Sequence, residues 1–94
     1  MDTAADDVRA HVVVRGRVQG VYFRASAAQE ARSLGLAGWV RKAGDDVEAV
    51  FEGSRHLVEQ MIDWCHHGPP RADVAQVDVQ LSGPEGLSGF IVRP

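Results

Sequence analysis

The fold is decided by the stretch GRVQGVYFR at residues 16–24, where a strand pattern passes into a helix pattern. A β-branched run ends just before this stretch, and apolar residues at helical spacing follow it. Its two glycines allow a tight loop whose consecutive main-chain N–H groups point inward, which makes an anion site at a helix N-terminus. Arg24 stands in the first helical turn, where a guanidinium can add a bidentate contact to phosphate.

Strand and helix patterns alternate along the rest of the chain. Residues 1–8 are expected to form a disordered lead-in, and residues 9–94 a single domain. Gly35 and the run Gly68-Pro69-Pro70 provide stop signals for two helices, the second of which has Ser54 as its N-cap. We predict strands at 9–15, 36–42, 47–52, 75–81 and 89–93, and helices at 23–34 and between Ser54 and Gly68.

This order of elements, β-α-β-β-α-β, predicts an α+β fold of the ferredoxin-like type. We expect a sandwich in which two helices cover one face of a four- to five-stranded antiparallel sheet. The strands at 9–15 and 47–52 are the richest in valine and are therefore expected in the centre of the sheet.

Composition restricts the function classes. The 94 residues carry a net charge of −3, which provides no general attraction to nucleic acid or to an anionic membrane. Cys65 is the single cysteine, so no intrachain disulfide is possible, and the start of the chain lacks the basic and apolar segments of a secretory signal. We expect a cytoplasmic monomer that binds neither nucleic acid nor membranes.

Several motifs together closely resemble those of the acylphosphatase family. The loop at 16–24 matches the family's first signature, and Gly38-Trp39-Val40 matches its second. The similarity continues to the end of the chain, through Val47-Glu48, Glu52-Gly53, the segment 68–72 (GPPRA) and the closing segment 89–93 (GFIVR).

The resemblance implies an enzyme that hydrolyses the carboxyl–phosphate bond of small acyl phosphates, with no metal or organic cofactor. It implies that Arg24 is catalytic and clamps the phosphate beside the loop amides. The loop residues expected to bind substrate are Gly16, Arg17, Val18, Gln19, Gly20, Val21, Tyr22 and Phe23.

One position departs from the family pattern. The family has an asparagine two residues after Gly-Trp-Val, thought to position the attacking water, and Lys42 stands at that place here. The chain contains no asparagine, and the turn at 43–46 is one residue shorter than usual. An amide donates and accepts hydrogen bonds together, whereas an ammonium only donates. We therefore predict reduced turnover, unless the short turn shifts the register and directs Lys42 to solvent.

Other functions remain as alternatives. A non-catalytic module could bind phosphate or acyl phosphate through Arg24, and the same strand order also serves RNA recognition. The RNA reading needs aromatic side chains on central strands, and residues 9–15 have none. The chain could also resemble the N-terminal domain of a larger maturation protein. The cluster of His56, Cys65, His66 and His67 lacks the spacing of a structural zinc site, so no metal site is expected.

Overall fold

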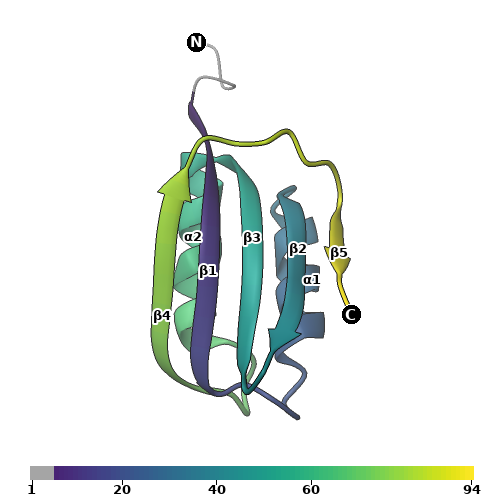
Figure 1. Cartoon of the computed structure of the whole chain (residues 1–94), viewed down its shortest axis with the longest axis vertical. Helices are drawn as coiled ribbons and strands as arrows, with labels where there is room; N and C mark the ends of the chain where they lie inside the picture. Colours follow the sequence, from purple (N-terminus) through teal and green to yellow (C-terminus); the bar gives the residue numbers. More distant parts are fainter. Residues whose placement is uncertain (1–5) are drawn as a thin grey trace.

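A computed structural model describes residues 6–94, whose backbone forms a sheet with two helices against one face (Figure 1). The sheet has five strands in the order β4-β1-β3-β2-β5. The elements are β1 (Asp7–Arg17), α1 (Phe23–Ser33), β2 (Ala37–Ala43), β3 (Asp46–Ser54), α2 (Arg55–His67), β4 (Asp73–Ser82) and β5 (Phe90–Val92).

The predicted ferredoxin-like arrangement is confirmed, with β1 and β3 inside the sheet. One part of the prediction is wrong, because the sheet is mixed and not wholly antiparallel. β5 pairs in parallel with β2, and its register brings Val92 beside Val40. The reason lies in the long connection 83–89, which crosses the end of the sheet and returns β5 in the direction of β2 (Figure 1).

The first strand is longer than its sequence pattern indicates. β1 begins at Asp7, and the side chain of Val8 is buried, so the predicted lead-in extends too far; residues 1–5 lie outside the described part of the chain. The strand also continues through Gly16 and Arg17, which were expected in the loop. Between Arg15 and Gly16 the pairing with β4 shifts by one residue, in a bulge where Ala75 of β4 has no partner on β1.

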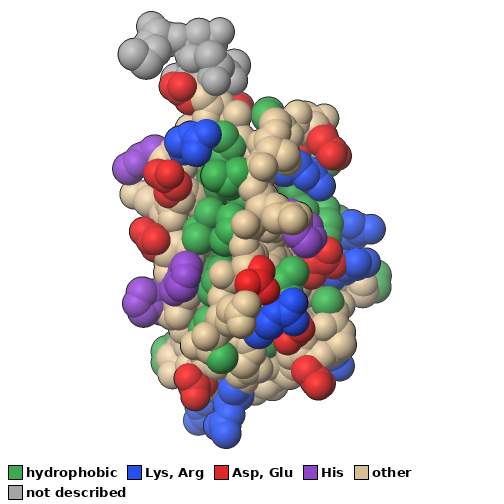
Figure 2. Space-filling model, turned by 60° about the vertical axis from the view of Figure 1, so that its left-hand side comes forward, with side chains coloured by type: hydrophobic (Ala, Val, Ile, Leu, Met, Phe, Trp, Pro, Cys, Tyr) green, Lys and Arg blue, Asp and Glu red, His purple; other side chains and the backbone are tan. Residues whose placement is uncertain are grey.

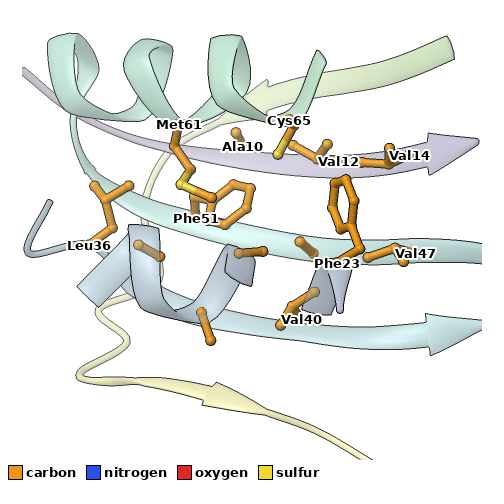
Figure 3. Packing of buried hydrophobic residues seen from close by; sticks show 14 of the residues in the cluster. Ala10, Val12, Val14, Phe23, Leu36, Val40, Val47, Phe51, Met61 and Cys65 are labelled. Carbon is orange, nitrogen blue, oxygen red and sulfur yellow. The ribbon is translucent and has the colours of Figure 1, made fainter. Parts of the chain in front are cut away.

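The core lies between the sheet and the helices, and its residues alternate along the strands. Met61 and Cys65 of α2 point toward the sheet, Met61 beside Phe51 of β3 and Cys65 beside Val12 of β1, all of them fully buried (Figure 3). Phe23, the first residue of α1, reaches into the same core. Burial of each such side chain contributes about 1.5–3 kcal/mol, so the start of α1 is firmly held against the sheet.

The other face of the sheet is not covered by either described helix (Figure 1), and it carries charged side chains of both signs, part of which Figure 2 shows. Arg15 joins three segments here, because its guanidinium lies 2.7 Å from Asp46 Oδ2 and 3.0 Å from Asp78 Oδ2. Glu48 accepts from Arg41 at 2.6 Å and lies 2.6 Å from His11. Cross-strand pairs of this kind suit a face that remains in water.

Residues 83–89, which we call the strap, connect β4 to β5 and are fixed from below by Glu52. The carboxylate of Glu52 accepts from the main-chain N–H groups of Glu85, Gly86 and Leu87 at 2.9–3.1 Å, and from Arg9 at 2.8 Å. Beyond the strap, the guanidinium of Arg32 on α1 donates twice to the carbonyl oxygen of Phe90, at 3.1 and 2.9 Å. These contacts set the position of β5 beside α1.

Candidate functional site

A hollow of about 500 Å³ lies where the loop after β1 enters α1. The loop is at the lower end of the view in Figure 1, where β2 also ends and toward which β5 runs. The residues lining the hollow come from the loop, the first turn of α1 and β5. They are Val18, Gly20, Tyr22, Phe23, Arg24, Ala25 and Val92.

Main-chain donors are concentrated in this segment. Among the described residues, no acceptor is found for the N–H groups from Val18 to Ala25, and the first hydrogen bond of the turn is donated by Ser26 to the carbonyl of Tyr22. The N-cap residue, Tyr22, makes no side-chain cap, and the first turn of α1 contains no acidic residue. A run of free N–H groups at a helix N-terminus favours an anion.

Arg24 adds a cation to the same place. Its side chain is half-buried and lines the hollow, and it forms no ion pair with any residue that the structure describes. A cation at a helix N-terminus opposes the helix dipole. A bound oxyanion would satisfy the guanidinium and the main-chain donors together, so the arrangement is suited to phosphate.

Side-chain contacts hold the loop in shape from below. Gln19 donates to the carbonyl oxygen of Asp46 at 3.0 Å, which ties the loop to the start of β3. Val18 and Val21 are buried, and the ring of Phe23 lies 5.4 Å from that of Trp64. These residues anchor the loop, and of the four only Val18 and Phe23 also line the hollow.

The predicted binding residues therefore separate into two groups. Val18, Gly20, Tyr22, Phe23 and Arg24 are brought together around the hollow. Four of the other predicted residues do not line it: Gly16 and Arg17 belong to β1, and Gln19 and Val21 support the loop from beneath.

Lys42 stands at the same end of the sheet but does not line the hollow. The β2–β3 ladder is continuous from Ala37 to Ala43, so Lys42 shares the helix-covered face with Val40, two residues before it. Its cross-strand partner is Val47, which lies next to Phe23 at the start of α1 (Figure 3). The short turn thus leaves the strand register regular, and the exposed Lys42 side chain is on the loop's side of the sheet.

Two lining residues, Ala25 and Val92, were not predicted. Ala25 simply follows Arg24 in the first turn of α1. Val92 shows its alternation with Phe90 in the sequence, but its place depends on the parallel pairing of β5 with β2. No local pattern indicates that pairing, so the sequence offered no signal that Val92 of β5 would line the hollow.

The remaining candidates lie elsewhere. Trp39 is on the helix-free face, where the guanidinium carbons of Arg41 and Arg93 lie 5.5 and 4.7 Å from its ring centroid. Within residues 6–94, no three His, Cys, Asp or Glu side chains are grouped to hold a metal ion. Neither described helix is long and apolar enough to cross a membrane.

Fold and hollow together define a class: a ferredoxin-like α+β protein with a hollow beside the loop that begins its first helix. The sequence model of the acylphosphatase family matches residues 10–92. The chain belongs to the acylphosphatase family.

Similar proteins agree with this assignment. An acylphosphatase of Natronomonas pharaonis is 53% identical over 90 residues, which are 95% of this chain and 98% of that protein. An acylphosphatase of a Nostoc species is 59% identical over 87 residues, covering 92% and 86%. The solved structure of an acylphosphatase from Coxiella burnetii superimposes with a TM-score of 0.93 at 37% identity, over 99% of both chains.

Proposed function

We propose that this chain hydrolyses the carboxyl–phosphate bond of small acyl phosphates, giving a carboxylate and inorganic phosphate. The observation that carries the proposal is that one hollow brings together main-chain donors and the guanidinium of Arg24, none of which has a partner among residues 6–94. In this scheme the N–H groups from Val18 to Phe23 and the Arg24 fork hold the three phosphate oxygens. Charge that develops on those oxygens in the transition state meets donors already in position.

The chemistry asks little more of the protein. Phosphoryl transfer needs stabilised equatorial oxygens, a water in line with the breaking bond, and a leaving group that departs. A carboxylate leaves readily and needs little protonation. The water attacks phosphorus, the bond from phosphorus to the carboxyl oxygen breaks, and one proton of the water is released as phosphate forms.

Water positioning is the part that Lys42 changes. An asparagine amide there would donate to one group and accept from the water, whereas the exposed lysine ammonium can only donate. Loss of one well-placed polar group in an active site costs about 10²–10³ in rate, or roughly 3–4 kcal/mol. We therefore propose that the chain binds phosphate in the manner of its family and turns over more slowly than a chain with asparagine.

The test is hydrolysis of benzoyl phosphate without added metal by the unchanged chain, Lys42→Asn and Arg24→Lys. We expect Lys42→Asn to raise kcat about tenfold or more. Arg24→Lys keeps the charge but loses the fork, so it should weaken inhibition by inorganic phosphate and lower kcat/KM by about 10². Equal kcat values for the unchanged chain and Lys42→Asn would refute the role given to position 42.

The second candidate function is a phosphate-binding module without turnover, which the lysine at position 42 favours. It predicts that phosphate binds in an Arg24-dependent manner while no variant releases benzoate.

The proposal also includes a monomeric state in the cytoplasm, supported by a lone cysteine that is buried. Sedimentation of the purified chain tests the monomer.

A further inference from the structure

Two large apolar side chains are left open to solvent in the hollow that contains Arg24. Tyr22 is 81% exposed and Val92 is 44% exposed, and both line the hollow. They come from the loop and from β5, which are positioned by separate sets of contacts. Apolar surface that stays open inside a site beside a charged group is typical of ligand contact.

The backbone at Tyr22 is in an unfavourable conformation. With φ 62° and ψ 27°, Tyr22 is the one non-glycine residue of the described chain whose φ is positive. A β-carbon makes this left-handed conformation costly, and such residues concentrate at functional sites. Its neighbours Val21 and Phe23 are both buried, so the two anchors hold the turn and leave the Tyr22 ring outside.

The ring has no structural role in the part of the chain that is described. Tyr22 belongs to no aromatic pair and its hydroxyl makes no hydrogen bond there, whereas Phe23 next to it packs on Trp64. No contact within the described part of the fold therefore explains why an aromatic ring stands at this strained position. The exposed ring is instead available to contact a bound molecule.

The charge distribution in the hollow indicates which part of the bound molecule would contact Tyr22. Of the residues that the structure describes, Arg24 is the single one with a charged side chain that lines the hollow, and the others are apolar, glycine or Tyr22 itself. The hollow thus has one end for an anion and one apolar wall. This inference rests on the proposed function: once phosphate occupies the Arg24 end, the acyl group is the portion left to meet the wall.

We infer that Tyr22 and Val92 form the acyl subsite, and that they select aromatic acyl phosphates over small ones. A flat acyl group can stack on the Tyr22 ring and contact Val92, which an acetyl group is too small to do fully. Stacking between two aromatic rings increases affinity by about three- to tenfold. Tyr22 and Val92 are specificity residues and take no part in bond making.

The test uses two stable mimics, acetylphosphonate and benzoylphosphonate, in which a carbon–phosphorus bond replaces the labile linkage. Their Kd values are measured for the unchanged chain, Tyr22→Asn and Tyr22→Phe. Asparagine accepts the left-handed conformation and lacks a ring, and phenylalanine is the matched control that keeps one. We expect the preference for benzoylphosphonate to fall three- to tenfold in Tyr22→Asn and to persist in Tyr22→Phe.

An unchanged preference in Tyr22→Asn overturns the inference, because a purely structural role for Tyr22 would weaken both mimics alike. Val92→Ser tests the other wall, where a lowered preference supports the subsite and an equal loss for both mimics contradicts it. Binding is measured apart from turnover, so the two claims fail separately. Discrimination without hydrolysis of benzoyl phosphate refutes the proposed function, and hydrolysis without discrimination refutes the acyl subsite.

Discussion

Gly16 of β1 lies opposite the bulge in β4, and it has no room for a side chain. A β-carbon there would run into the carbonyl oxygen of Asp73 and lie 2.7 Å from the amide nitrogen of Ala75, and its φ of 129° is unfavourable for other residues. We expect Gly16→Ala to lower the free energy of unfolding by about 3 kcal/mol, because the clash is with backbone that cannot rotate away. Urea denaturation of the purified variant measures this loss.

Gly20, in the same loop, provides the matched control. Its φ is 71°, but no atom lies within 4 Å of the position that a β-carbon would take. Gly20→Ala should therefore cost only about 1 kcal/mol, the price of the left-handed conformation alone. Equal losses in the two variants would show that the contact with β4 is not what makes Gly16 necessary.

At the scale of elements, the strap depends on one buried carboxylate. Glu52 is 4% exposed and accepts from three main-chain N–H groups and from Arg9. Glu52→Gln replaces one acceptor oxygen by an NH₂ group that faces other donors. We therefore expect the free energy of unfolding, measured by urea denaturation, to fall by about 2–3 kcal/mol.

Glu85→Gln is the control for the strap. The Glu85 side chain is 66% exposed and lies 3.5 Å from Arg9, so its removal should change stability by less than about 1 kcal/mol. If the two variants lost the same stability, the main-chain contacts of Glu52 would not be what holds the strap.

For the whole molecule, the carboxylates Glu48 and Glu52 contribute to a dependence of stability on pH. Contact with His11 lowers the pKa of Glu48; burial opposes this, and Arg41 lowers the pKa further. Burial alone would raise the pKa of Glu52, but the strap amides and Arg9 outweigh it and the net pKa is lowered. Because both pKa values are depressed on folding, their stabilisation is complete above the ordinary glutamate range of about 4–5 and disappears as pH falls below it.

We expect the urea concentration at the unfolding midpoint of the unchanged chain to decrease as the pH is lowered from about 5 to about 3. Glu52→Gln should be less stable at pH 7 and should show a smaller further loss on acidification, since one of the two groups no longer titrates. Parallel pH profiles for the two chains would mean that Glu52 does not contribute to acid sensitivity.

Much of the molecule could be predicted from its local patterns. Alternation and helical spacing indicated the order of elements, and valine content indicated the central place of β1 and β3. The loop glycines indicated where Arg24 meets free donors. The parallel pairing of β5, and with it the place of Val92, could not be predicted, because pairing between distant strands depends on the path of the strap. Burial of Glu52 escaped prediction for the same reason, since the strap that covers it lies far along the chain.

The parallel alignment of β5 with β2 has a consequence for transplanting this site. Residues 16–24 grafted onto a different scaffold would bring along Arg24 and the free amides but would leave Val92 behind. On a scaffold that also supplies the contacts made here by Asp46 and Trp64, such a graft should still capture inorganic phosphate while treating acetylphosphonate and benzoylphosphonate alike. In the proposed scheme, anion capture thus needs only the loop and its anchors, whereas discrimination between acyl groups needs β5 beside β2.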